Sequence, residues 1–172
     1  MTYVRKACLS DVEEIMHIIE QGRSLLAKEG IPQWTGTYPS RDLIEHDIRH
    51  GVAYVLVFSN QVAGFASMIA GVEAYYNNLH DGSWANEDPY CTIHRFGISP
   101  DFKGNHLGEF FFSGLVTLAY AEGIKNVRAD THDKNARMKY IMEKQGFVKR
   151  GYVEVPDDET DPKRIAFELN LK

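Results

Sequence analysis

The sequence predicts a mixed α/β fold in which helices flank a central sheet. Segments with strand-like alternation are interspersed with segments whose apolar residues recur every three or four positions. One alternating segment, 90–99, passes through a glycine-containing turn directly into a long amphipathic helix. Two β-prone segments close the chain. This order of strands and helices is typical of a mixed sheet covered by helices.

The first part of the chain is expected to form a strand and two helices. A strand over residues 3–8 leads to a helix capped by Ser10, and a second helix spans residues 40–50. Pro32 and Gly36 interrupt helical structure between them. The residues expected to face the core recur at helical spacing: Ile15, Ile18, Ile19, Leu25 and Leu26 in the first helix, and Leu43, Ile44 and Ile48 in the second.

The rest of the chain is expected to alternate between strands and helices. Residues 53–58 and 62–69 form a hairpin, and the segment 71–89 is long and irregular. The later elements follow in order: strand 90–99, helix 106–122, strand 125–129, helix 135–145, and strands 147–155 and 164–171. We expect one domain, residues 1–172, because a chain of this length with 44% hydrophobic residues can bury a full core.

Composition argues against several functional classes. The formal charge of −5 and the lack of a basic stripe disfavour a nucleic-acid partner, since such proteins bind through clustered Lys and Arg. No apolar run reaches about 18 residues and no signal segment is evident, which favours a cytoplasmic protein with no membrane association. Cys8 and Cys91 are too few for a disulfide framework.

Seven histidines and two cysteines raise the question of a metal site. The closest pair is Cys91 and His94, three residues apart on an expected strand. Side chains at that spacing point to opposite faces of a strand, so these two cannot chelate one ion without distortion. We therefore expect no metal.

The junction between the strand at 90–99 and the helix that follows it is suited to bind an anion. The first amides of a helix have no partner inside it, and the helix dipole favours a negative charge at this end. Lys103 adds a cation, and Gly104 lets the backbone bend and approach a ligand closely. On spacing alone, the pattern equally fits an ordinary strand-to-helix connection.

A second segment decides between these alternatives. Lys103-Gly104-Asn105-His106-Leu107-Gly108 resembles the acetyl-CoA pyrophosphate loop of the GNAT N-acetyltransferase superfamily, commonly Gln/Arg-x-x-Gly-x-Gly/Ala. Residues 135–147, from Asn135 to Gly146-Phe147, resemble the later Asn…Glu-Lys-x-Gly-Phe motif of that superfamily. The two motifs occur in the expected order and are separated by a helix and a strand, and the opening segment 4–11 is also similar to that of many members.

The resemblance implies the GNAT acyl-CoA N-acyltransferase fold and acetyl-CoA as cosubstrate. In the family, backbone groups of the strand before the loop bind the pantetheine arm, which implies a cofactor role for Phe96, Gly97 and Ile98. Asn135 would flank the other side of the cofactor, although from local sequence alone it equally fits a helix N-cap. The residues implied to hold the pyrophosphate are those of the loop: Lys103, Gly104, Asn105, His106, Leu107 and Gly108.

Direct acetyl transfer to a primary amine in a ternary complex needs positioned substrates and a neutral amine. Relatives often place a catalytic carboxylate on the cofactor-facing side of this strand, and this chain has none there. His94 is the candidate base, and a core histidine bonded to a neighbour is the alternative. Strand alternation places five residues on that face: Tyr90, Thr92, His94, Phe96 and Ile98.

Two positions depart from the family pattern. Met142 stands where many relatives carry a tyrosine that protonates the leaving thiolate, and a thioether has no proton to donate. Tyr140 cannot simply replace it, because two residues along a helix turn a side chain by roughly 200°. His106 stands where glycine is usual, so either the backbone approaches the phosphate more tightly or the imidazole itself contacts it.

Four residues are candidates for acceptor binding, since loops shape the acceptor pocket in this family. Trp34 and Tyr38 follow the first helix, Trp84 lies in the irregular segment, and His132 ends the strand before the second motif. Each aromatic side chain could instead fill a space under its loop, and His132 could instead be a turn residue.

The leading hypothesis is an acetyl-CoA-dependent N-acetyltransferase acting on a small-molecule or peptide amine. The missing carboxylate and Met142 leave open a CoA-binding sensor or scaffold protein of the same fold with little catalytic activity. An ATP-binding module is disfavoured because the loop lacks a Gly-Lys-Ser/Thr ending. The sequence identifies neither the amine nor whether the chain forms a homodimer.

Overall fold

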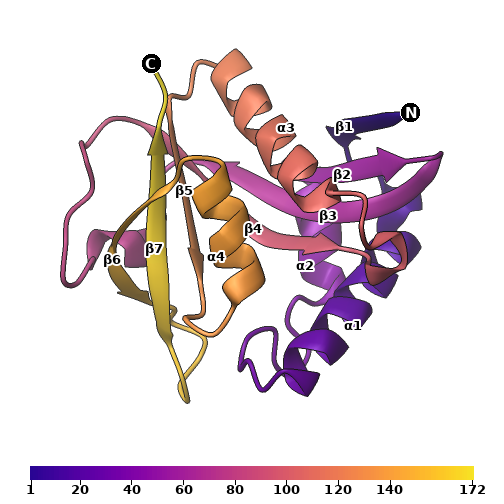
Figure 1. Cartoon of the computed structure of the whole chain (residues 1–172), viewed down its shortest axis with the longest axis horizontal. Helices are drawn as coiled ribbons and strands as arrows, with labels where there is room; N and C mark the ends of the chain where they lie inside the picture. The colour runs from indigo at the N-terminus through magenta and orange to yellow at the C-terminus, as the bar shows by residue number, and fades with distance from the viewer. The chain divides into compact units, whose positions relative to one another are not determined.

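The computed structural model describes residues 1–172 and contains the strands and helices in the order expected from the sequence (Figure 1). The α-helices are α1 (Val12–Lys28), α2 (Arg41–Arg49), α3 (Leu107–Ala121) and α4 (Ala136–Lys144). The strands are β1 (Thr2–Lys6), β2 (Ala53–Phe58), β3 (Gln61–Ala70), β4 (Tyr90–Ile98), β5 (Asn126–Thr131), β6 (Val148–Glu154) and β7 (Lys163–Asn170). None of the helices combines the length and the apolar character needed to cross a bilayer.

The strands are hydrogen-bonded in the order β1-β2-β3-β4-β5-β7-β6. β4 and β5 are parallel, whereas β1 with β2, β2 with β3, and β7 with both β5 and β6 are antiparallel. The sheet is therefore mixed, which confirms the predicted fold class. By its internal contacts the chain divides into two compact units, residues 1–68 with 94–115 and residues 69–93 with 116–172. The single domain expected from the sequence stays a prediction.

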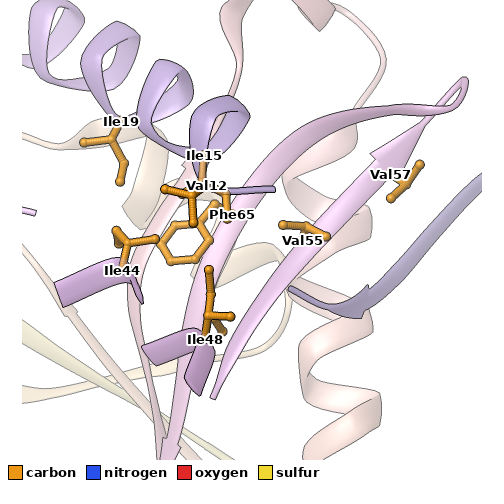
Figure 2. Packing of buried hydrophobic residues seen from close by; sticks show 9 residues of the cluster. Val12, Ile15, Ile19, Ile44, Ile48, Val55, Val57 and Phe65 are labelled. Atoms are coloured by element: carbon orange, nitrogen blue, oxygen red, sulfur yellow. The ribbon is translucent and has the colours of Figure 1, made fainter. Parts of the chain in front are cut away.

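The core of the first unit lies between two helices and the β2–β3 hairpin. Figure 2 shows side chains of α1 and α2 converging on Phe65 of β3. Each buried aliphatic side chain contributes roughly 1.5–3 kcal/mol relative to an exposed one. The buried members of this cluster are Val12, Ile15, Ile19, Ile44, Ile48, Ala53, Val55, Val57 and Phe65. The helical spacing in the sequence therefore identified the inward faces of both helices.

The start of α1 differs from the predicted one. Leu9–Asp11 form a short 3-10 turn, and Asp11 rather than Ser10 immediately precedes α1. The Asp11 carboxylate accepts the N–H of Cys8 at 2.8 Å and forms a 2.7 Å ion pair with Arg5 of β1. Asp11 thus links β1 to the start of the helix, and its ion-pair partner precedes it by six residues.

The remaining boundaries in the first unit follow local sequence signals. The Ser40 hydroxyl accepts the N–H of Leu43 at 3.3 Å, so α2 begins as predicted. Between β2 and β3, Ser59 and Asn60 have φ values of 49° and 64°. Two consecutive residues in this region form the tight turn that matches the twist of a hairpin, so the predicted hairpin is confirmed.

The second unit contains the long segment between β3 and β4, which follows a defined path. It includes a 3-10 turn, Ala74–Asn77, and an isolated bridge in which His80 pairs with Tyr152 of β6. Close approach of two backbones requires glycine here, because a Cβ on Gly82 would lie 1.7 Å from the carbonyl oxygen of Arg150. The segment expected to be irregular is thus held against β6.

Replacing Asp11 with asparagine should destabilise the protein at neutral pH and reduce its loss of stability in acid. The hydrogen bond from Arg5, opposed by burial, lowers the pKa of Asp11 from 3.8 to about 2. A lowered pKa stabilises the folded state above pH about 4, and this stabilisation is lost as the pH falls towards about 2. We expect a cost of about 1–2 kcal/mol at neutral pH, because the Arg5 side chain is 36% exposed and the pair is partly screened.

Urea unfolding of the wild-type and Asp11→Asn proteins at neutral pH and near pH 2 checks this prediction. Glu14→Gln is the matched control, since it removes a carboxylate from an exposed position of the same helix. The two proteins should differ in unfolding free energy at neutral pH and much less near pH 2. The same difference at both pH values would contradict the assigned role of the ion pair.

Candidate functional site

β4 carries three of the ten predicted cofactor residues and the candidate base His94, and its backbone is not regular. Arg95 has a φ of 55°, in the left-handed region, whereas regular strand residues are extended. A left-handed residue within a strand interrupts the extended backbone locally, as at a β-bulge, and we refer to this point as the bulge of β4. The prediction that Tyr90 and Thr92 share a face with Phe96 and Ile98 stays a prediction.

Beyond the bulge, alternate residues of β4 pack in different directions. The Phe96 ring lies 5.3 Å from that of Phe111 and 5.2 Å from that of Phe112, both on α3. Gly97 instead lies against Trp34, whose Cη2 atom would be 3.1 Å from a Cβ at this position. His94, immediately before the bulge, is half-buried, and both of its predicted roles stay open.

Trp34 is packed between a helix and a strand. A Cβ on Gly22 of α1 would lie 2.8 Å from Cζ3 of Trp34, and Gly97 of β4 approaches the same ring. The two glycines therefore form the slot into which the indole fits. The structure thus brings together Trp34, a predicted acceptor residue, and Gly97, a predicted cofactor residue.

A buried ion pair that sequence reasoning missed anchors the bulge. The Arg95 guanidinium contacts the Asp47 carboxylate of α2 at 2.7 Å, and both side chains are less than a tenth exposed. Ser67 of β3 donates to the same carboxylate, and Arg95 donates to the Tyr38 hydroxyl at 3.4 Å. Burial alone would lower the pKa of Arg95, but Tyr38 and Asp47 raise it above its usual value. Arg95 therefore stays charged and ties β4 to α2.

One signal in the sequence could have revealed this pair. Asp47 immediately precedes the core residue Ile48 and follows Ile44 by three positions, so it lies near the inward side of α2. A carboxylate buried at such a position needs a cationic or hydrogen-bonding partner. The sequence does not show which of the many Lys and Arg residues that partner is.

The loop from Lys103 to Gly108 has the backbone expected of a turn into a helix. Gly104 and His106 have φ values of 87° and 52°, and α3 begins at the next residue, Leu107. The Asn105 amide donates to the carbonyl of Phe102 at 2.9 Å, which closes the turn. The His106 side chain is 85% exposed, with Nδ1 3.5 Å from Glu109. His106 adopts the conformation for which glycine is favoured, which accounts for glycine being usual at this position.

Asn135 and His132 lie in the turn before α4 in the second unit. The Asn135 side chain accepts the N–H of Met138 at 3.1 Å, so Asn135 caps α4. His132 is buried, its Nε2 lies 2.9 Å from Asp161, and its Nδ1 accepts the N–H of Lys134 at 3.1 Å. Both ring nitrogens are engaged within the protein, which favours the turn role of His132 over contact with an acceptor.

Trp84 packs inside the second unit. Its indole N–H donates to the Tyr76 carbonyl at 2.9 Å, and its ring lies 4.1 Å from the guanidinium carbon of Arg128. Contact between Trp84 and the acceptor stays a prediction. On α4, Met142 is fully buried whereas Tyr140 is 51% exposed, so the two positions differ in environment as the helical geometry requires.

Comparison with known proteins places the chain among acetyltransferases. The acetyltransferase (GNAT) family model matches residues 19–147. A GNAT-family acetyltransferase structure from Streptococcus agalactiae is 33% identical, with 99% of this chain and 96% of that chain covered and a TM-score of 0.89. Among curated proteins, none matches the sequence significantly.

More distant structures share the fold. A GNAT-family acetyltransferase from Listeria monocytogenes has a TM-score of 0.74 at 18% identity, with coverage of 99% of this chain and 95% of that one. PaiA N-acetyltransferase from Thermoplasma acidophilum, solved in complex with coenzyme A, has a TM-score of 0.69 at 15% identity, with 99% of each chain covered. The family match over most of the chain and the 33% identical relative show that this protein belongs to the GNAT family of acetyltransferases.

Proposed function

We propose that the protein transfers the acetyl group of acetyl-CoA to the nitrogen of a primary amine, by direct attack in a ternary complex. The observation that carries this proposal is the turn at 103–106, where Gly104 and His106 adopt left-handed backbone conformations immediately before α3. In a GNAT-family chain, such a turn presents the unpaired amides of the helix to a pyrophosphate. The coenzyme A bound in the PaiA structure supports the same class of cofactor.

The cofactor residues of β4 are suited to hold an extended arm. The ladder between β4 and β5 ends at Thr92 and Arg128, whereas β4 continues to Ile98. Backbone groups of Phe96, Gly97 and Ile98 would bind the pantetheine amides as an added strand would. Lys103 is exposed and would place its ammonium group near the phosphates, while Asn135 would act through the start of α4.

The reaction needs a neutral amine and a proton for the leaving sulfur. The nitrogen lone pair forms a bond to the thioester carbonyl carbon, the carbon–sulfur bond breaks, and the thiolate of CoA takes up a proton while the nitrogen loses one. His94, half-buried on β4, is proposed to accept the proton from the amine. Met142 is fully buried and has no proton to give, so the thiolate would be protonated by another group or by water.

Replacing Gly108 with tryptophan should raise the Kd for acetyl-CoA more than tenfold. Gly108 is the second residue of α3, where a large ring would shield the amides that the pyrophosphate needs. Isothermal titration calorimetry of the full chain with acetyl-CoA measures the effect. Glu122→Trp, which adds the same ring just past the other end of α3, is the control and should bind as the wild type does. Absence of binding by the wild type at millimolar acetyl-CoA would overturn the proposed function.

Replacing His94 with alanine should lower kcat by about 10²-fold or more while leaving the Kd for acetyl-CoA within about twofold, because a base acts on the chemical step. Release of the CoA thiol with a panel of primary amines gives the rate, and calorimetry gives the affinity. His17→Ala, at an exposed position of α1, is the control. Wild-type turnover by His94→Ala would remove His94 from the mechanism, and binding without thiol release for every amine would favour a CoA-binding sensor.

A further inference from the structure

Asp130, near the carboxyl end of β5, has one carboxylate oxygen held by tyrosines and the other open. The hydroxyl of Tyr75 donates to Oδ2 at 2.9 Å, and the hydroxyl of Tyr76 donates to the same oxygen at 2.8 Å. No protein donor reaches Oδ1, and the residue is only half-buried. The carboxylate is therefore fixed in orientation by two phenols and still has a free set of lone pairs.

The two tyrosines form a rigid frame for this carboxylate. Tyr76 is 1% exposed, and its ring lies 4.9 Å from that of Tyr75 at 84° and 5.2 Å from that of Trp84. Burial, together with the charge of Asp130, raises the pKa of Tyr76 well above its usual value. Tyr76 is therefore a neutral donor over the physiological pH range and does not compete for the negative charge of Asp130.

Glu168, in the same unit, is a carboxylate whose hydrogen bonds are all made within the protein. Glu168 is fully buried, and its two oxygens bind Arg128 at 3.0 Å, Arg150 at 2.9 Å and the amide of Ala85 at 2.9 Å. Both oxygens of Glu168 are satisfied and its charge is neutralised. Asp130 has two neutral donors on one oxygen and no cationic partner, so it keeps the capacity to bind a cation.

A second polar group on the same face also lacks a partner. Thr92 is the last residue of β4 in the ladder and pairs with Arg128, so their side chains point to the same face of the sheet. Asp130 follows Arg128 by two residues and shares that face. The Thr92 hydroxyl is buried and has no hydrogen-bond partner in the protein. Buried polar atoms are nearly always bonded, so this hydroxyl has hydrogen-bonding capacity left for a group on this face of the sheet.

We propose that Oδ1 of Asp130, bordered by Tyr75 and Tyr76, binds the ammonium group of the acceptor. This inference rests on the proposed acetyl transfer and adds the residue and the substrate class. A carboxylate beside aromatic rings recognises a cation through a charged hydrogen bond and through the ring faces. The acceptor is therefore an aliphatic primary amine that is protonated when it binds. A neutral or anionic nitrogen compound would not satisfy this site.

Titration of the full chain with n-butylammonium chloride tests the site without requiring turnover. In protein labelled with carbon-13 in its aspartate side chains, the Asp130 carboxyl signal should shift saturably with a Kd of about 10 mM or tighter, and n-butanol should have no effect. Asp130→Asn lacks this signal, so its binding is followed by backbone amide shifts in both proteins, and it should be at least about tenfold weaker, because the amide keeps its shape but loses its charge. Asp133→Asn is the control, since it removes an exposed carboxylate three residues away.

The outcomes separate this inference from the proposed function. If acetyl-CoA binds by calorimetry but the Asp130 signal shows no ammonium-dependent shift, the amine site is overturned and the cofactor assignment stays intact. An ammonium affinity that Asp130→Asn leaves unchanged has the same meaning. For any amine that is turned over, Asp130→Asn should raise KM about tenfold or more with little change in acetyl-CoA affinity. A lower melting temperature for Asp130→Asn with unchanged KM would show that Asp130 only supports the tyrosines, and would also overturn the proposal.

Discussion

The first unit depends on the ion pair between Arg95 and Asp47, which holds the bulge of β4 in place. Both side chains are almost fully buried, and removing one partner of such a pair typically costs roughly 3–5 kcal/mol because the other charge is left uncompensated. The left-handed backbone at Arg95 sets the direction of the residues that follow it. Beyond it, Phe96 packs on α3 while Gly97 lies under Trp34. The proposed pantetheine strand is therefore positioned by a charge pair and not by the apolar core alone.

Polar contacts have a comparable role in the second unit. The segment between β3 and β4 has little regular structure, yet the amide of Ala85 bonds to Glu168 and the indole of Trp84 bonds to the backbone of Tyr76. The guanidinium of Arg128 lies over the rings of Trp84 and Tyr90, at 4.1 and 3.8 Å. These bonds satisfy the polar groups of the connection that face inward, although most of its residues are exposed. Arg128 and Arg150 both bind Glu168, and Asp130 has no cationic partner.

The sequence predicted what local patterns determine and missed what long-range pairing determines. Helical spacing identified the buried faces of α1 and α2, and the Ser40 cap lies within reach of its own helix. The bulge at Arg95 has no local mark, since arginine is not a residue that favours a positive φ, and so β4 was expected to alternate without interruption. The slot for Trp34 needs Gly22 and Gly97, which lie 75 positions apart in the sequence. The loop motif at 103–108 was recognisable because its turn chemistry is contiguous.

Binding a cation and activating it as a nucleophile place opposite demands on a site. A carboxylate such as Asp130 stabilises the ammonium form and raises the pKa of a bound amine, which disfavours attack on the thioester. The amine must then give its proton to another group before its lone pair can react. A histidine can accept that proton without carrying a permanent negative charge, as proposed for His94. Recognition of the cation and removal of its proton are therefore separate tasks, and a chain that lacks a carboxylate on β4 needs residues for both.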